Sequence, residues 1–165
     1  MSLPPADSHR VNGPTPSPAE ATERRAVMAL TARAGGDELA AVRDLAPAGV
    51  VDLRAPEVGL VMVRGRMGGT GAAFNLGEAT VTRAAVRLPS GTVGFAHRLG
   101  RDGAAARDAA LVDALWQEGG ATRARLDAAI LTPLTDRLAA ADGRRAAEVA
   151  ATRVDFFTLV RGEDR

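Results

Sequence analysis

The chain has 165 residues, a net charge of +1 from 21 basic and 20 acidic side chains, and no cysteine, lysine or tyrosine. This composition excludes disulfides, thiolate metal sites, Schiff-base chemistry, a P-loop lysine and a phenolic acid or base. The near-neutral charge and the 3% aromatic content argue against a nucleic-acid partner, and no apolar run is long enough to cross a membrane.

The chain begins with a segment that has almost nothing to bury. Residues 1–16 are rich in proline and polar side chains and lack the apolar core of a signal peptide. We therefore expect a disordered Pro-rich tail over 1–16, a single domain over 17–165, and a cytoplasmic protein.

Two helices are expected at the start of the domain. Ser17-Pro18-Ala19-Glu20 has the pattern of a capping box with proline in the first turn, and the glycine pair 35–36 ends that helix. Asp37 is expected to cap a shorter helix that Pro47 stops. Both helices carry apolar residues at helical spacing.

The middle of the chain has the composition of strands. We expect strands over 50–54 and 60–66, separated by Pro56, and a third over 79–88. A turn at 89–91 then joins the third strand to a fourth over 92–98. Alternation along 60–66 places Arg64 and Arg66 on the same face of their strand, next to a glycine-dense loop.

The second half changes to helical periodicity. Asp102 is expected to cap a helix that runs to Glu118, and Thr122 to cap the next one. We expect Pro133 to kink that second helix and the Asp-Gly pair 142–143 to break it, although an alanine-rich helix could resume as far as Arg153. Residues 154–160 have strand composition. A ladder of apolar residues four apart predicts core or partner-facing packing: Leu126, Ile130, Leu134 and Leu138.

These elements together predict an α+β fold. We expect a mainly antiparallel sheet of four or five strands, with helices at the N-terminal end and a helical segment toward the C-terminus.

The candidate ligand-binding residues are Arg64, Arg66, Gly68 and Gly69. Paired guanidinium groups beside exposed backbone N–H groups can hold phosphate or carboxylate oxygens. The alternative, which arginine statistics favour, is that Arg64 and Arg66 form ion pairs with Glu57, Glu78 or a partner subunit. Tight-turn geometry or the close approach of another chain is likewise the favoured use of the glycines.

The remaining candidates are assigned to interfaces. We expect Asn75 and Glu78 to form hydrogen bonds across a subunit boundary, and Phe156 and Phe157 to be buried there, with the intrachain core as the competing account for the two phenylalanines. His97 has no nearby nucleophile or second histidine and is interpreted as a structural residue. We predict no catalytic residue and no metal ligand in this chain.

Two long strings give the chain a family resemblance. The string from Arg54 to Arg83, which contains VGLVMVRGRMGGTG and FNLGEATVTR, resembles the G-subunit family (PhnG) of the bacterial carbon–phosphorus lyase system. The similarity continues through the segments 99–102 and 110–115 and through ATRVDFFTLVRGE at 151–163. It covers residue 20 to the end, without a departure in the central string.

This resemblance implies a role in phosphonate catabolism. Members of the family assemble with H, I and J subunits, and the I subunit is the closest expected partner. The resemblance implies that the complex displaces adenine from ATP with a phosphonate such as methylphosphonate, to give the ribose 1-phosphonate 5-triphosphate. That chemistry is attributed mainly to the I subunit, so we expect an accessory subunit that binds no cofactor alone, with ATP as a co-substrate of the complex.

Two other functions stay open at this point. The chain could be a stand-alone module that binds a nucleotide or a phosphonate through Arg64, Arg66 and the glycine loop. It could also be a pure scaffold that contacts no ligand in the complex.

Overall fold

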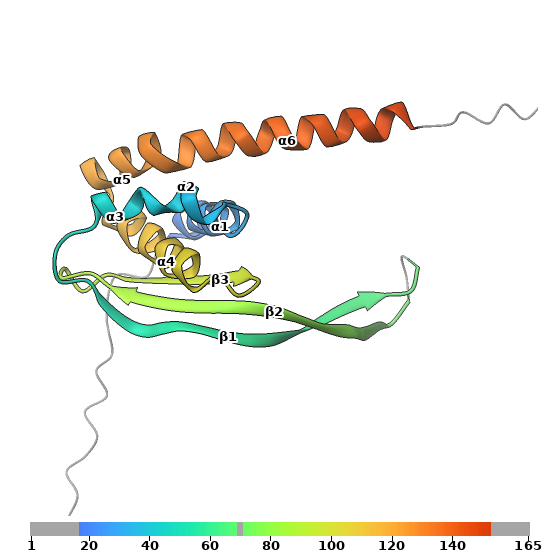
Figure 1. The fold of residues 1–165 in the computed structure, drawn as a ribbon, viewed down its shortest axis with the longest axis horizontal. Helices are drawn as coiled ribbons and strands as arrows, with labels where there is room; N and C mark the ends of the chain where they lie inside the picture. The colour runs from blue at the N-terminus through green and yellow to red at the C-terminus, as the bar shows by residue number, and fades with distance from the viewer. Residues whose placement is uncertain (1–16, 69–70, 153–165) are drawn as a thin grey trace, which may run out of the picture.

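A computed structural model describes residues 17–68 and 71–152 of the chain. Helices cover one face of an antiparallel sheet whose strand order is β1-β2-β3, while no helix of the described residues covers the other face (Figure 1). The α+β prediction is therefore confirmed. The sheet within the described residues has three strands instead of the predicted four or five.

The difference in strand number begins at Pro56. Residues 51–66 form one continuous strand, β1 (Val51–Arg66), where the sequence predicted two strands with Pro56 between them. Strand β1 lies at the edge of the sheet and pairs only with β2, so the missing N–H of a proline does not disturb pairing with a second strand. The pairing register shifts between Arg54 and Glu57, on either side of the proline. The remaining strands are β2 (Ala73–Arg87), which begins six residues earlier than predicted, and β3 (Val93–Leu99). The predicted strand at 154–160 lies outside the described residues.

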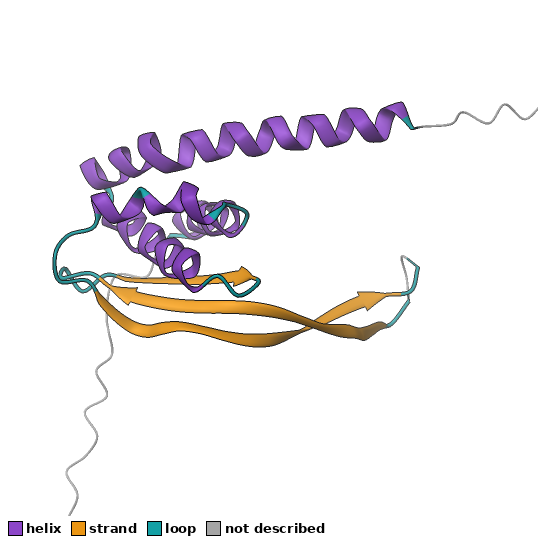
Figure 2. Cartoon of the chain, viewed as in Figure 1, coloured by secondary structure: helices purple, strands orange, loops and turns teal. Residues whose placement is uncertain are grey.

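The helices agree more closely with the sequence (Figure 2). The predicted helix starts at Ser17 and Asp102 are confirmed: the Glu20 backbone N–H donates to Ser17 Oγ at 3.2 Å, and the Ala105 N–H donates to Asp102 Oδ1 at 2.9 Å. The predicted short helix is split in two and begins at Gly36, so Asp37 lies in its first turn and is not its cap. In chain order the helices are α1 (Pro18–Ala32), α2 (Gly36–Ala40), α3 (Val42–Leu45), α4 (Gly103–Glu118), α5 (Gly120–Leu126), the π-helix η1 (Asp127–Leu131) and α6 (Thr132–Ala151).

The last helical segment departs from the prediction at three points. It begins at Gly120, so Thr122 lies inside α5 and is not its cap. The backbone irregularity expected at Pro133 takes the form of the π-helical turn η1, which ends just before it; a π-turn accommodates the missing N–H donor without ending the helix. The expected break at 142–143 is absent, because α6 continues through both residues to Ala151.

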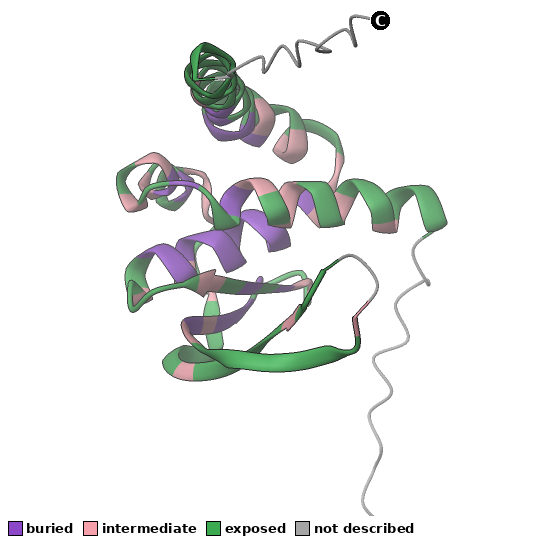
Figure 3. Cartoon of the chain, turned by 90° about the vertical axis from the view of Figure 1, so that its right-hand side faces the viewer, coloured by how far each residue is buried: buried purple, intermediate pink, exposed green. Residues whose placement is uncertain are grey.

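Helix α4 is the centre of the core. It lies between the sheet and the other helices, so eleven of its sixteen residues are buried (Figure 3). Strand β3 approaches it very closely: a Cβ atom added to Gly94 would lie 2.0 Å from the carbonyl oxygen of Ala110. The glycine at 94 is therefore required by the packing of β3 against α4. The four-residue ladder Leu126, Ile130, Leu134 and Leu138 is buried in the same core, as predicted.

Burial of α4 also buries two of its carboxylates. Asp113 accepts hydrogen bonds from Arg24 Nε and Nη2 of α1, both at 2.8 Å, and from the backbone N–H of Phe95 in β3 at 2.9 Å. Asp108 is paired in the same two-pronged way with Arg43, at 3.0 and 2.7 Å. Each buried charge is thus neutralised by an arginine from another element, which burial at this depth requires.

Helix α6 is attached to the body over only part of its length. Arg137 pairs with Glu38 of α2, and Arg33, which follows α1, donates to Asp142 at 2.8 Å. All residues from 142 to 152 are exposed. The end of α6 and the far end of the β1–β2 hairpin both extend past the other helices on the same side of the molecule (Figure 1). No helix in the described part of the chain has the length and apolar content needed to cross a bilayer.

The Asp113 contacts give a first prediction. Asp113→Ala should lower the free energy of unfolding by about 3–5 kcal/mol, because the change leaves the partly buried Arg24 and the Phe95 N–H without their partner. Urea denaturation followed by circular dichroism measures this loss. Asp136→Asn, which changes an exposed carboxylate on α6, is the control and should shift the midpoint little. Equal effects of the two changes would contradict the role of Asp113.

Attachment of α6 should weaken in acid. The Gly35 backbone N–H, which donates to Glu38 Oε2 at 2.6 Å, and the Arg137 guanidinium together lower the pKa of Glu38 below its ordinary value. A carboxyl group with a lowered pKa stabilises the fold above its unfolded pKa of about 4.3, and this contribution is lost as the pH falls through the folded pKa. The stability difference between wild type and Glu38→Gln, measured by urea denaturation between pH 3 and 7, should therefore be constant above about pH 5 and shrink in acid. A difference that grows on acidification would contradict this sign.

Candidate functional site

The candidate residues of the central string lie on a projecting two-stranded ribbon. Strand β3 pairs with β2 only as far as Val81, so residues 60–66 of β1 and 73–80 of β2 extend beyond it. We call residues 60–66 and 73–80 the hairpin arm. Among the described residues, no further strand borders either of its edges and no helix covers either of its faces (Figure 1).

The hairpin arm exposes an unusual amount of apolar surface. Six of its large apolar side chains are at least 40% exposed: Leu60, Val61, Met62, Val63, Phe74 and Leu76. Alternation along β1 puts Leu60 and Met62 on one face and Val61 and Val63 on the other. A two-stranded ribbon with apolar side chains on both faces is only marginally stable in water. An exposed apolar surface of this kind is typical of a protein–protein interface.

Arg64 and Arg66 lie near the end of the arm. Arg64 is opposite Asn75 and Arg66 is opposite Ala73, with no irregularity between these two pairs, so the prediction that the arginines share a face is confirmed. Both are exposed. Arg66 Nη1 donates to the carbonyl oxygen of Gly71 at 3.3 Å.

The expected ion pairs of these arginines are not found. Glu57 instead pairs with Arg54 at 2.8 Å and with Arg83 at 3.4 Å. Within residues 17–68 and 71–152, no carboxylate lies within 4.0 Å of the guanidinium of Arg64 or Arg66. Within these ranges the two guanidinium groups therefore have no carboxylate partner, and apart from the bond from Arg66 to Gly71 their N–H donors can bind a further group.

Glycines shape the end of the arm. Gly68 has a φ of +61°, in the region that favours glycine. A Cβ on Gly71 would lie 2.2 Å from the carbonyl oxygen of Met67, so the loop closes on itself at that point. These observations agree with the prediction of a tight turn. Gly69 lies outside the described residues.

The remaining candidates have different positions. Asn75 and Glu78 lie within β2, and both are exposed on the hairpin arm; Glu78 is opposite Met62. Phe156 and Phe157 fall outside the described residues. His97 is an exposed residue of β3. The sequence analysis did not predict Phe74 and Leu76 to lie in a strand or to form part of the site. They alternate with Ala73 and Asn75, which is a strand pattern, but the neighbouring glycines interrupt it.

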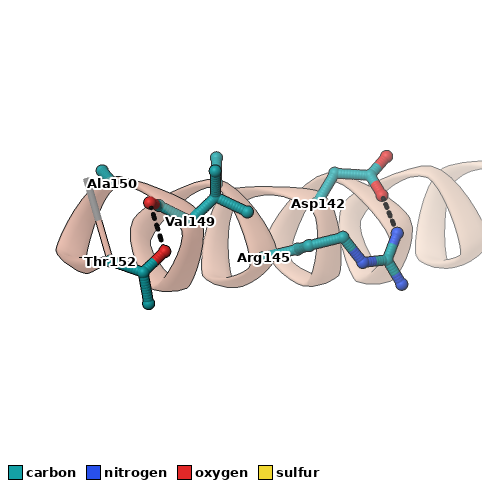
Figure 4. A pocket seen from close by; sticks show the side chains of 6 residues that line it. Asp142, Arg145, Val149, Ala150 and Thr152 are labelled. Atoms are coloured by element: carbon teal, nitrogen blue, oxygen red, sulfur yellow. Dashed lines mark hydrogen bonds and ion pairs between the residues drawn. The ribbon is translucent and has the colours of Figure 1, made fainter. Parts of the chain in front are cut away.

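A hollow of the surface lies on α6 and does not form an enclosed site. Its lining residues come from the last turns of that one helix and from Thr152 just after it, so no second element of the described residues lines it (Figure 4). Arg145 and Asp142 form an ion pair there at 3.7 Å. Nor do any three histidine, aspartate or glutamate side chains gather as metal ligands in the described ranges.

Comparison with known proteins gives a consistent result. Residues 22–162 match the family model described as "Phosphonate metabolism protein PhnG". A protein of Rhizobium meliloti (strain 1021) is 52% identical over 152 residues, which is 91% of this chain and 96% of the relative. Its name is alpha-D-ribose 1-methylphosphonate 5-triphosphate synthase subunit PhnG.

Proposed function

The chain belongs to the PhnG family, and from this membership we propose that it is a subunit of alpha-D-ribose 1-methylphosphonate 5-triphosphate synthase, acting in phosphonate metabolism. Its role is accessory: it supports the displacement of adenine from ATP by a phosphonate such as methylphosphonate. In this reaction the bond from the ribose anomeric carbon to adenine breaks, and a bond to a phosphonate oxygen forms. The observation that carries the proposal is the 52% identity over nearly the whole of both chains.

The hairpin arm supports a role as a subunit. Its apolar side chains are exposed on both faces, and its edges offer unpaired backbone groups. A monomer in water would gain from hiding such a surface, because exposed strand edges and large apolar patches promote association. The I subunit is the partner that we propose for the arm, with the H and J subunits as further members of the assembly.

The arginines of the arm supply a contact with the substrate. The triphosphate of ATP and the phosphonate are both anions, and a guanidinium group binds such oxygens in a two-pronged geometry. We assign Arg64 and Arg66, together with the backbone at Gly68 and Gly69, to the triphosphate in a site that a partner completes. The chain holds no cofactor alone, and ATP is a co-substrate of the assembly. Because ATP is a cytoplasmic metabolite, the proposal places the assembly in the cytoplasm.

Polar substitutions on the arm should separate folding from assembly. Leu60→Ser with Met62→Ser changes two side chains that are 62% and 57% exposed, so the melting temperature of the isolated chain should change little. Co-purification with the other synthase subunits should fall at least tenfold, since the change removes apolar contact area. Ala139→Ser, an exposed site on the attached part of α6, is the matched control. Normal assembly of the double variant would contradict the interface.

The substrate contact is tested in the assembled enzyme. Arg64→Ala with Arg66→Ala should raise the KM for ATP or lower kcat/KM by at least tenfold, because each lost charge-assisted hydrogen bond represents about 1.5–3 kcal/mol. Arg54→Ala is the matched control, since Arg54 lies on the same strand and is engaged by Glu57. Adenine release, followed chromatographically, is the measurement.

Four outcomes distinguish the possible roles. Unchanged turnover of an intact assembly would refute the triphosphate contact and leave a scaffold. Loss of assembly without altered kinetics of the remaining complex would make these arginines interface residues. Adenine release by the isolated chain would overturn the accessory role, and micromolar ATP binding by that chain in calorimetry would favour the stand-alone module.

A further inference from the structure

The face of the sheet that points away from α4 is open. Ala84, Val86 and Ala96 belong to the core beneath the helices. Side chains alternate along a strand, and directly opposite residues of neighbouring strands lie on the same face. The odd-numbered residues 77–87 of β2 and 93–99 of β3 therefore lie on the other face, which no helix of the described residues covers (Figure 1). We call this the outer face of the sheet.

The outer face continues onto the hairpin arm. The pairing of β1 with β2 is regular over residues 57–63 of β1, so the odd-numbered residues of that range lie on this face too. Beyond that range, Leu76 is an extra residue on β2 and forms a bulge. A Cβ on Gly65 would lie 2.5 Å from Leu76 Cδ1, so Leu76 lies on the outer face, as does Phe74, which is opposite Gly65.

The two faces of the arm differ in chemistry. Over residues 59–65 and 74–81, the outer face has no charged side chain, whereas the opposite face carries Arg64 and Glu78. The large apolar side chains of the outer face are at least 40% exposed on the arm, and Leu99 of the adjoining β3 is 76% exposed. The outer face of the arm is therefore apolar throughout.

The charges of the outer face gather at its other end, over the body of the molecule. Glu57 pairs there with Arg54 at 2.8 Å and with Arg83 at 3.4 Å. Arg87 is exposed on the same face and has no ion pair within the described ranges. Three arginines thus accompany one glutamate, and this end of the outer face has a net positive charge.

The outer face is large enough to form an interface. Strand β1 has 16 residues. With about 3.3 Å per residue and about 4.8 Å between strands, a face of this length measures about 50 Å by 10 Å, or roughly 500 Å². Each partner in a stable protein–protein complex contributes about 800 Å². The outer face therefore supplies most of one partner's share.

A second copy of this chain does not match the outer face. Two sheets that pack face to face keep their strands roughly aligned, and two identical chains do so about a two-fold axis. If the strands of the two copies run in the same direction, Arg83 and Arg87 lie against the same arginines of the second copy. If they run in opposite directions, these arginines lie on the apolar arm of the second copy, without a carboxylate. Both arrangements bury uncompensated positive charge, which costs free energy.

We propose that another subunit of the synthase covers the outer face from Phe74 to Arg87, with an apolar surface over the arm and carboxylates over Arg83 and Arg87. This inference rests on the proposed role as a subunit and adds the face that is covered and the chemistry of the partner. The face is unbroken from the arm to the body, so a partner that binds the apolar part also meets the arginines. Apolar contact supplies affinity, and the charges fix the orientation of the partner.

Thiol labelling tests whether the outer face is covered. The chain has no cysteine, so Val63→Cys and Leu99→Cys each place a single thiol of this chain on the outer face. In the isolated chain, both thiols should react readily with a maleimide, because both positions are exposed. In the assembled synthase, the reaction should be at least tenfold slower, measured from the mass of the labelled peptide. Ala139→Cys, at an exposed position of α6, is the control and should react equally fast in both states.

The labelling results separate this inference from the proposed function. An assembly in which both outer-face thiols react as fast as in the isolated chain would overturn the inference and leave the subunit role intact. Failure of the wild-type chain to join the other synthase subunits would refute the subunit role and the inference with it. Protection in the isolated chain that is lost on dilution would show a second copy on the outer face and overturn the choice of partner.

Charge reversal tests the carboxylates of the partner. Arg87→Glu should weaken binding to the remaining synthase subunits at least tenfold at low salt, because it places like charges against each other. The difference from wild type should shrink as salt is added. Titration of the fluorescently labelled chain with these subunits measures the Kd. Arg125→Glu, the same change at an exposed arginine of α5, is the matched control. Equal affinities of the two variants would contradict the proposed charge pairing.

Discussion

The carboxylate of Asp113 is the contact on which the arrangement of the body depends. It lies in the middle of a helix buried between sheet and helices, and it binds α1 through Arg24 and β3 through the Phe95 N–H. A buried carboxylate must be paired and hydrogen-bonded, so Asp113 holds α1 and β3 against α4. This placement sets α1 beside the edge of β3. Asp108 and Arg43 hold the other end of the same helix in a similar way.

The body is well packed, whereas the two projections from it are not. Buried residues gather around α4, but the hairpin arm and the end of α6 leave their side chains exposed. An independent monomer would not maintain so long an apolar ribbon, since nothing offsets the cost of its hydration. In the proposed subunit role the same ribbon carries Arg64 and Arg66 well beyond the body, toward the site proposed for the triphosphate. The absence of cysteine, lysine and tyrosine from the chain fits the accessory role proposed for it.

Arginine performs all the cationic tasks in this chain. Two-pronged pairs neutralise Asp108 and Asp113, Arg98 caps the end of α1, and Arg123 lies 4.0 Å from the centre of the Trp116 ring. A planar fork with several donors suits each of these contacts better than an ammonium group would. The arginines of the arm end carry the same planar fork, without a carboxylate partner among the described residues. They are thus distinguished by their surroundings and not by their side-chain type.

Local signals in the sequence determined most of the elements. The caps at Ser17 and Asp102, the turn at 89–91 and the buried ladder from Leu126 to Leu138 depend on nearest neighbours along the chain, and all are confirmed. The shared face of Arg64 and Arg66 follows from strand alternation, and the family strings indicated the function. Tertiary structure alone decided the rest. Pro56 is tolerated because β1 is an edge strand, α6 continues through Asp142, which accepts a hydrogen bond from Arg33, and Glu57 pairs with Arg54 and Arg83 and not with Arg64. Each of these outcomes depends on a partner distant in sequence or on a position within the sheet, and neither is encoded in a local pattern.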